Sequence, residues 1–288
     1  MIKSAQNIIG SVMCCPGCFS LYRVKALAGV MSLYSEPTLE AGDVFTKDTG
    51  EDRWMCTLMM LRGWKLKYST FGVNSTFCPD TITEFIKQRR RWILSDFANS
   101  LMVFKNLPQL IRSNGCFSMI YVFYLLQLFF IVFLSPGSTI IMLTVGLDVL
   151  IKVPFVIITP MVVALFVLYG VLCVQLSSQS QITLTKVFML ILGLSMICVV
   201  VGAAVFVVHD IITENNLQLQ EHFILIALTA SIFYAAILHP SECYLLVHGI
   251  FYVFFFPTMH ILLPVYALSN IVDQTWGTRE NVSIFLFI

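Results

Sequence analysis

The chain has 288 residues, of which 58% are hydrophobic and only 11% are charged. About a quarter of the residues in a soluble domain are charged, so the composition excludes an ordinary soluble globular protein. The formal net charge of +1 conceals an asymmetry, because residues 1–115 sum to +5 and residues 116–288 sum to −4. Charges separated in this way predict a polar region followed by a membrane region.

The polar region, residues 1–115, is too short and too often interrupted for a complete α/β domain. We expect short strands at 7–13, 19–22, 65–68 and 71–73, and helices at 23–33 and 52–62, the second ended by Gly63. Thr81 followed by Glu84 has the pattern of a capping box and predicts a third helix from 82 to about 104.

An acidic pair stands at the start of one of these helices, in the segment Gly50-Glu51-Asp52-Arg53-Trp54. Acidic side chains at a helix N-terminus are stabilised by the helix dipole, and the residues alone favour this structural explanation. The functional alternative is a carboxylate held at a loop-to-helix junction, where it can act as a general base.

A second cluster, Gln88-Arg89-Arg90-Arg91-Trp92, lies within the third predicted helix. Gln88, Arg91 and Trp92 are spaced i, i+3, i+4 and share one face, whereas Arg89 and Arg90 point elsewhere. Arginine can clamp phosphates, glutamine can bind a sugar or phosphate oxygen, and tryptophan can stack on a sugar ring. Three arginines before a membrane span also fit binding to anionic lipid, but the tryptophan and the upstream acids favour a ligand site.

The cysteine and histidine patterns predict no metal site. Cys15 and Cys18 form a C-x-x-C pair, but a structural zinc site needs a second pair, and none follows at a usable spacing. His248 and His260 lie inside an expected membrane span. We expect them to be hydrogen-bonded packing residues, with a cavity-lining role as the alternative.

Residues 116–272 contain five long stretches without charged side chains. A helix of roughly 20 residues crosses the hydrocarbon core of a bilayer, so we expect spans near 119–144, 153–173, 187–208, 222–239 and 245–268. The first stretch contains Ser135-Pro136-Gly137, which either kinks one helix or separates an interfacial helix from a span.

Loop charges give an orientation for these spans. The loop at 209–221 has three acidic residues and no Lys or Arg, and the positive-inside tendency places it outside. Residues 1–115 are then cytoplasmic, and five spans put residues 273–288 outside, where the sequon Asn281-Val282-Ser283 could be glycosylated. A role for the Trp276 and Arg279 stretch beside the active site would instead need the tail inside and an even number of crossings, with the miscount around Ser135-Pro136-Gly137. The first 20 residues lack the apolar core of a secretory signal peptide, so insertion is expected to rely on the later spans.

The two clusters resemble the acidic base motif and the Q-x-x-R-W motif of the processive family 2 glycosyltransferases. Further stretches resemble chitin synthases of the animal type, and the similarity runs in the same order along nearly the whole chain. These stretches are Cys15-Pro16-Gly17-Cys18-Phe19-Ser20-Leu21-Tyr22-Arg23, Gly50-Glu51-Asp52-Arg53-Trp54 with Cys56-Thr57-Leu58, and Trp276-Gly277-Thr278-Arg279-Glu280.

The resemblance implies a fold class and a domain plan. Residues 1–115 would be the C-terminal part of an α/β, GT-A-like glycosyltransferase domain, 116–272 a multi-span α-helical membrane domain of about five spans, and 273–288 a tail with the W-G-T-R-E motif. The protein would be a multi-pass plasma-membrane protein in the lipid bilayer, with its transferase part in the cytoplasm. A homo-oligomer is compatible with this plan, and no nucleic acid partner is expected.

The implied reaction transfers N-acetylglucosamine from UDP-N-acetylglucosamine to the 4-hydroxyl of a growing β-1,4 chitin chain, with inversion at the anomeric carbon, and the spans export the chain. Asp52, with Glu51, would supply the general base. Gln88 and Arg91 would hold the donor diphosphate, and Trp92 would stack on the acceptor sugar. Arg53 is grouped with these binding residues, and a gating role is expected for Trp276, Thr278 and Arg279.

The family binds its nucleotide and a divalent metal, Mg or Mn, with acidic motifs that include a D-x-D, and this sequence has no D-x-D. We therefore expect a fragment or a truncated gene model of a larger synthase, inactive alone and without the main metal ligands. The alternatives are another processive synthase such as hyaluronan synthase, a membrane transporter or channel, and a membrane pseudoenzyme that pairs with an intact synthase.

Overall fold

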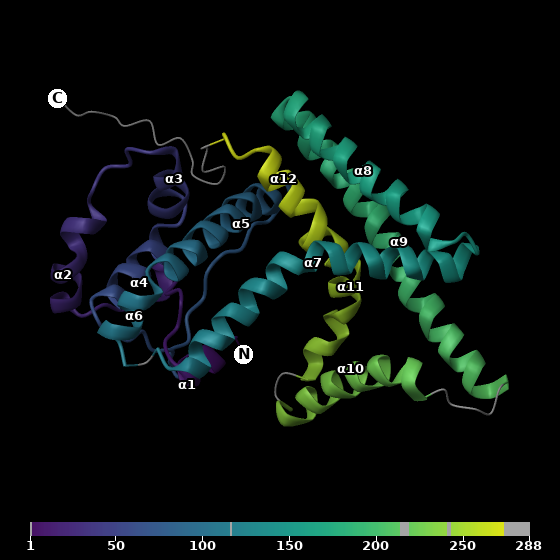
Figure 1. The fold of residues 1–288 in the computed structure, drawn as a ribbon, viewed down its shortest axis with the longest axis horizontal. Coiled ribbons are helices and arrows are strands. Elements are labelled where there is room, and N and C mark those ends of the chain that lie inside the picture. The colour runs from purple at the N-terminus through teal and green to yellow at the C-terminus, as the bar shows by residue number, and fades with distance from the viewer. Residues whose placement is uncertain (1, 116, 214–218, 241–242, 274–288) are drawn as a thin grey trace. The chain divides into compact units, whose positions relative to one another are not determined.

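The computed structural model describes residues 2–115, 117–213, 219–240 and 243–273 (Figure 1). The chain forms two compact units, a first made of Met1–Phe133 with Tyr266–Ile288 and a second made of Leu134–Val265. The elements of the first unit are α1 (Ile2–Ile9), η1 (Gly17–Phe19), α2 (Val24–Tyr34), α3 (Ala41–Asp43), η2 (Val44–Asp48), α4 (Glu51–Leu61), α5 (Ile82–Lys105), α6 (Leu107–Ser113), the first part of α7 (Met119–Ile151) and the end of α12 (Leu263–Ser269).

Helix α4 is the centre of the hydrophobic core of the first unit. Every side chain from Trp54 to Met60 is buried except that of Met55. Ala26 and Val30 of α2 join this core; they are four residues apart and so lie on one face of their helix, which packs against α4. The buried Tyr121 of α7 donates a hydrogen bond from its hydroxyl to the Ser11 carbonyl. These contacts fix α4, and with it the acidic pair at its start.

The described residues contain no strand, so the α/β part of the expected fold class is not confirmed. The predicted strand at 7–13 is wrong because α1 runs to Ile9, and 19–22, 65–68 and 71–73 also form no strand. Val12 N donates to the Leu66 carbonyl (3.2 Å), and Ser11 Oγ bonds both backbone polar groups of Leu66. A strand needs a ladder of such backbone bonds, but a single backbone-to-backbone hydrogen bond joins these two segments.

The three predicted helices of the polar region are confirmed as α2, α4 and α5. Thr81 caps α5, because its side chain accepts a hydrogen bond from Glu84 N at 3.2 Å. Gly63 follows α4 with a φ of +82°, in the left-handed region where glycine is favoured, and a Cβ there would lie 2.7 Å from the Ser113 carbonyl oxygen.

The second unit is built from long apolar helices. Its elements are the rest of α7, α8 (Phe155–Gln175), α9 (Ser178–Thr213), α10 (Leu219–Leu238), η3 (Cys243–His248), α11 (Gly249–Pro257), η4 (Thr258–Leu262) and the start of α12. Among the described residues, four helical segments are long and apolar enough to cross a membrane: Met119–Ile151, Phe155–Gln175, Ser178–Val205 and Cys243–Ser269. The fifth expected span, 222–239, coincides with α10, which is not one of these four.

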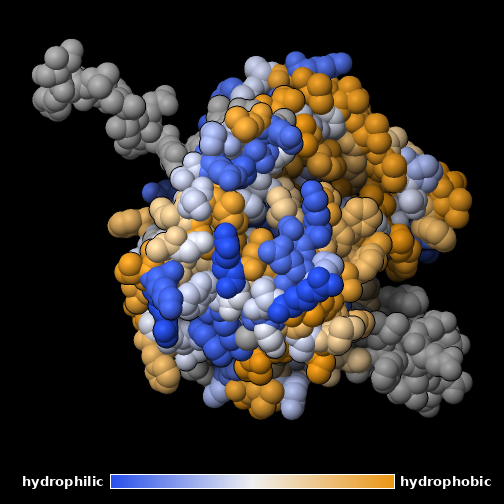
Figure 2. Space-filling view, turned by 60° about the vertical axis from the view of Figure 1, so that its left-hand side comes forward, coloured by the Kyte–Doolittle hydropathy of each residue, from blue (hydrophilic) through white to orange (hydrophobic). Residues whose placement is uncertain are grey.

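Glycines let the helices of the second unit approach closely. A Cβ on Gly146 of α7 would lie 2.2 Å from Val199 of α9, and one on Gly193 of α9 would lie 2.5 Å from the ring of Phe254 in α11. Small residues at such contacts are typical of helix packing in membranes, where no hydrophobic effect pulls the helices together. Large apolar side chains stay exposed along α8 and α9, and Figure 2 shows wide apolar surface of this kind.

Helix α7 continues through Ser135-Pro136-Gly137 instead of dividing there. The boundary between the two compact units nevertheless falls one residue before Ser135. The 33 residues of α7 correspond to about 50 Å of helix, which exceeds the thickness of a hydrocarbon core, about 30 Å. The part before the boundary packs on α5, where the ring of Phe129 lies 5.2 Å from that of Phe104.

Candidate active site

The two clusters lie on the packed helices α4 and α5, and a glycine makes their close approach possible. Gly50 is buried, and a Cβ at this position would lie 1.9 Å from Ser95 Oγ and 2.7 Å from Asn99 Nδ2. Only a residue without a side chain fits this space unless neighbours move. The start of α4, where the acidic pair stands, is therefore held against one face of α5.

That face of α5 is the one that carries the predicted ligand-binding residues. At 100° per residue, Gln88, Arg91, Trp92, Ser95 and Asn99 fall within an arc of about 100°. Arg91 and Trp92 precede Ser95 by one turn, which is about 5–6 Å along the helix axis. The structure thus brings the face of the Q-x-x-R-W residues to the helix start that carries Glu51 and Asp52.

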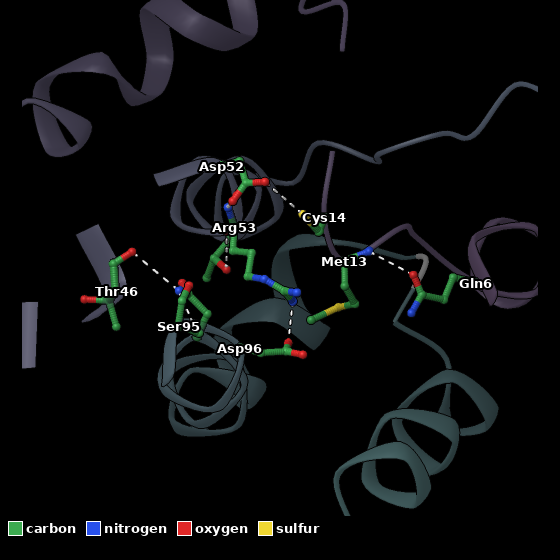
Figure 3. A network of polar contacts seen from close by, with 10 residues as sticks. Gln6, Met13, Cys14, Thr46, Asp52, Arg53, Ser95 and Asp96 are labelled. Carbon is green, nitrogen blue, oxygen red and sulfur yellow. Dashed lines mark hydrogen bonds and ion pairs between the residues drawn. The ribbon is translucent and has the colours of Figure 1, made fainter. Parts of the chain in front are cut away.

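Asp52 is half-buried and accepts two hydrogen bonds (Figure 3). Arg53 N donates to Asp52 Oδ1 at 2.8 Å, as expected for a carboxylate in the first turn of a helix. The Cys14 thiol donates to Asp52 Oδ2, with 3.4 Å between sulfur and oxygen. Burial raises the pKa of Cys14 to about 12, so the thiol stays protonated and remains a donor to the carboxylate.

Glu51 is half-buried at the first position of α4. Burial, and after it the charges of Glu51 and Asp52, raise the pKa of Tyr34, so this phenol at the end of α2 lies within the field of both acids. The sequence prediction did not include Tyr34 or Cys14. Both lie far from Asp52 in the sequence, and no spacing pattern connects them to it.

Arg53 forms an ion pair with Asp96 of α5 (Figure 3). Its backbone carbonyl also accepts a hydrogen bond from Thr57 Oγ1 at 3.0 Å. The two charged side chains are 28% and 52% exposed, so solvent screens the pair. In this structure Arg53 braces α4 against α5, and its predicted binding role is untested.

Arg89 differs from the sequence expectation. Its guanidinium lies 4.7 Å from the centre of the Trp92 ring and 5.1 Å from that of Phe85, in cation–π geometry. The expectation treated Arg89 as pointing away from the Q-x-x-R-W face, but the i, i+3 spacing lets its long side chain reach Trp92. Burial lowers the pKa of Arg89. Trp92 is 40% exposed, so part of the indole stays accessible to a sugar ring.

Arg90 points away from this face, as the sequence predicts. It lies about 140° around α5 from Ser95, is 4% exposed and forms an ion pair with Asp273, which follows α12. Sequence reasoning missed this contact. The tail residues Trp276, Thr278 and Arg279 lie outside the described residues.

Cys15, the first cysteine of the C-x-x-C segment, contacts the buried Cys56 of α4. Cys15 N donates to Cys56 Sγ at 3.1 Å, and a hydrogen bond between the two thiols, together with burial, raises the pKa of Cys56. Within the described ranges, no three His, Cys, Asp or Glu side chains converge in a way that could hold a metal ion. The described residues therefore do not fit the divalent metal that the family resemblance implies.

Comparisons with known proteins identify the family of this chain. The family model described as chitin synthase matches residues 1–198. The chain is 32% identical over 281 residues to chitin synthase chs-2 of Caenorhabditis elegans, covering 97% of this chain and 16% of the relative. It is 32% identical over 284 residues to a chitin synthase of Meloidogyne artiellia, covering 98% of this chain and 15% of the relative.

A shorter match is to an N-acetylglucosaminyltransferase of Rhizobium leguminosarum bv. viciae, 34% identical over 110 residues, or 38% of this chain and 25% of the relative. The chain thus spans 16% or less of the length of the two nematode relatives. The family match covers both helices that carry the clusters, continues through the first two membrane-span candidates and ends within the third. This chain belongs to the chitin synthase family.

Proposed function

We propose that this chain forms part of the active site and the export path of a membrane glycosyltransferase that makes chitin. The donor is UDP-N-acetylglucosamine, and the acceptor is the 4-hydroxyl of a growing β-1,4 chain. The observation that carries the proposal is the packing of Gly50 on Ser95, which joins the acidic pair of α4 to the Gln88, Arg91 and Trp92 face of α5. The names of the relatives support the choice of product.

Asp52 acts as the general base in this proposal. Its carboxylate takes the proton of the acceptor hydroxyl as that oxygen attacks the anomeric carbon, the bond to UDP breaks, and the configuration inverts. The protonated Cys14 thiol holds Oδ2, and the helix start stabilises the negative charge before the proton arrives. Glu51 supports the local negative potential beside it.

Gln88 and Arg91 bind the donor diphosphate, and Trp92 stacks on the acceptor sugar. The planar guanidinium of arginine binds phosphate oxygens in pairs, which holds the leaving group in line with the attack. Arg89 covers part of Trp92 and orients the indole. The divalent cation implied by the family stays a prediction, and no step here depends on it.

The membrane helices provide the path for the product. A cytoplasmic site that lengthens a polysaccharide needs a route across the bilayer, and the apolar helices of the second unit meet the length requirement for spanning it. We propose the plasma membrane as the location and the cytoplasm as the side of the transferase part.

The test uses membranes that contain the native chain, including any coding sequence upstream of Met1. Radiolabelled UDP-N-acetylglucosamine is supplied, and insoluble product that chitinase digests is counted. Asp52→Asn should lower synthesis about 10²–10⁴-fold, the usual contribution of general acid–base catalysis, with unchanged protein level. Unchanged synthesis by this variant would refute the role of Asp52, whereas no synthesis by the wild-type chain would favour a transporter or channel.

A matched control is Asp48→Asn, which changes an exposed acid at the end of η2, outside the site. This variant should synthesise chitin at the wild-type rate. A second arm adds UDP-glucuronic acid. A requirement for it, with a product that chitinase does not digest, would identify a hyaluronan-type synthase instead.

A further inference from the structure

Arg90 and Asp273 form an ion pair between residues 183 positions apart in the sequence. The Arg90 side chain is 4% exposed and that of Asp273 is 30% exposed. A buried guanidinium is costly without an acceptor, and the Asp273 carboxylate is one of the groups that stabilise Arg90 inside the first unit. Both residues belong to that unit.

The segment that carries Asp273 is anchored before it reaches α5. Tyr266 and Ala267 of α12 are buried, and the nearly buried Asn270 donates from Nδ2 to the Tyr266 carbonyl at 3.0 Å. The backbone N–H of Asp273 donates a hydrogen bond to the Asn270 carbonyl at 3.0 Å, which ties Asp273 to this turn. The ion pair is therefore the end of a packed connection, three residues before Trp276 begins the W-G-T-R-E stretch.

We propose that Arg90 and Asp273 are positioning residues that fix the start of the W-G-T-R-E tail to α5 on the cytoplasmic side of the membrane. Asp273 binds the side of α5 that faces away from Ser95, and the opposite face carries Gln88, Arg91 and Trp92. The pair thus sets where α5 lies relative to the end of the last membrane segment. The ligand-binding role of α5 rests on the proposed function. The placement of the start of the tail rests on the ion pair alone.

The ion pair also determines the parity of the membrane crossings. Arg90 and Asp273 must lie on the same side of the bilayer to touch, so the chain between them crosses an even number of times. The four candidate segments in the described part of the chain satisfy this condition, whereas a crossing by α10 as well would violate it. With these four crossings, Asp273 and the start of the tail lie in the cytoplasm, in contrast to the outside position that five spans predict.

The placement of the tail is tested first, in this chain alone, in sealed vesicles with the cytoplasmic face outward. An epitope after Ile288 should be digested by added protease without permeabilisation, and Asn281 should carry no glycan. A matched chain with the epitope inserted after Asn216, in the acidic loop, should be protected until detergent is added. Protection of the C-terminal epitope, or a glycan on Asn281, would overturn the proposal.

The pair itself is tested by exchange of its charges in the native chain, including any coding sequence upstream of Met1. Arg90→Asp and Asp273→Arg should each lower kcat for polymer synthesis at least tenfold, while KM for UDP-N-acetylglucosamine stays within twofold. The double variant should recover at least a third of the wild-type kcat. A double variant no better than either single variant would overturn the pairing.

Two further variants distinguish a positioning role of Asp273 in catalysis from a role in folding alone. Asp273→Asn keeps the shape of the side chain but replaces the carboxylate with an uncharged amide, whose oxygen is a weaker acceptor. The variant should fold and accumulate as the wild type does, while kcat falls. Asp43→Asn, which removes an i, i+4 ion pair with Lys47 outside the site, should leave kcat unchanged. If Asp273→Asn accumulates normally and keeps the full kcat, the positioning role is wrong.

Failure of this inference is distinguishable from failure of the proposed function. If the wild-type chain makes no chitin, the protease and glycan measurements still decide where the tail lies. Protease resistance of the first unit then replaces kcat as the measure of charge exchange, with loss in each single variant and recovery in the double variant expected. If chitin is made and the tail lies outside, the proposed function stands and this inference fails.

Discussion

Both units bring helices together at glycines, but the side chains that face these glycines differ in kind. In the first unit Gly50 faces two polar side chains of α5. In the second unit the facing side chains, on α7, α9 and α11, are all apolar. Three such contacts among the described residues of the second unit are Gly146 with Val199, Gly202 with Leu150, and Gly193 with Phe254.

The chemical difference between the facing side chains indicates that the glycine contacts of the second unit serve packing alone, whereas the Gly50 contact does not. Apolar contacts suffice to hold helices in a membrane, and the second unit uses them. At the Gly50 junction, Ser95 Oγ and Asn99 Oδ1 are buried and have no hydrogen-bond partner among the described atoms. An unsatisfied buried polar atom costs about 1–3 kcal/mol, so packing does not explain these residues. Their position beside the start of α4 fits a site that exchanges hydrogen bonds with a ligand or with water.

The largest effect is expected from Gly50→Val, which breaks the polar junction. A Cβ here already meets Ser95 Oγ at 1.9 Å and Asn99 Nδ2 at 2.7 Å, and valine adds two methyl groups. We expect a loss of about 3 kcal/mol in the free energy of unfolding, the upper part of the range for overpacked sites, with synthesis abolished. Thermal unfolding in detergent and the chitin assay measure the two effects.

A compensating variant sharpens this result. Gly50→Ala alone should lower the unfolding midpoint less than Gly50→Val, and Ser95→Gly in the same chain should restore part of the loss because it removes the atoms nearest the new Cβ. A Gly50→Val chain with an unchanged midpoint would show that α4 and α5 are not packed at this glycine.

An intermediate effect is expected from Gly193→Ala in the second unit. The new Cβ would lie 2.5 Å from the ring of Phe254, but the ring of this half-buried side chain can turn. We expect about 1–2 kcal/mol of destabilisation, measured by thermal unfolding in detergent, and recovery when Phe254→Leu is added. Donor binding, measured with labelled UDP-N-acetylglucosamine, should stay unchanged, in contrast to Gly50→Val. Weakened donor binding would contradict a packing-only role for this junction.

The helices of the first unit were predictable because their signals are local. Thr81 and Glu84 mark the start of α5 within four residues, and Gly63 marks the end of α4. The shared face of Gln88, Arg91 and Trp92 follows from helical spacing alone. The strands failed for the opposite reason. A strand exists only with a partner, and the apolar segment at 7–13 has a helix over its first residues and one backbone bond to Leu66.

The contacts that complete the site could not be predicted because they join distant parts of the chain. Cys14 meets Asp52 across 38 residues, and Arg90 meets Asp273 across 183. One signal for Asp273 was present in the sequence, since it is the first acid after a long stretch without charge. The sequence contains no pattern that chooses Arg90 as its partner over Arg89, which instead covers Trp92.

The smallest effect at neutral pH is expected from Cys14→Ala, which tests the polar surroundings of Asp52 through their pH dependence. The thiol has an ordinary pKa of 9.0, which burial raises to about 12 in the folded chain. Between these values the folded state keeps a proton that the unfolded state has released, so stability falls as the pH rises from 9 towards 12 and is fully present below 9. At pH 7 the variant loses a thiol hydrogen bond, worth about 1 kcal/mol or less.

The two chains should therefore diverge only in alkali. Between pH 9 and 11 the wild type should lose about 1.4 kcal/mol per pH unit more than Cys14→Ala, seen as a steeper fall of the unfolding midpoint. Cys14→Ser keeps a hydroxyl donor for Asp52 but has no group that titrates in this range, so it should match Cys14→Ala in pH dependence and the wild type in synthesis at pH 7. Parallel midpoint curves for wild type and Cys14→Ala would mean that the thiol is not buried against Asp52, and the polar character assigned to this junction would lose its support.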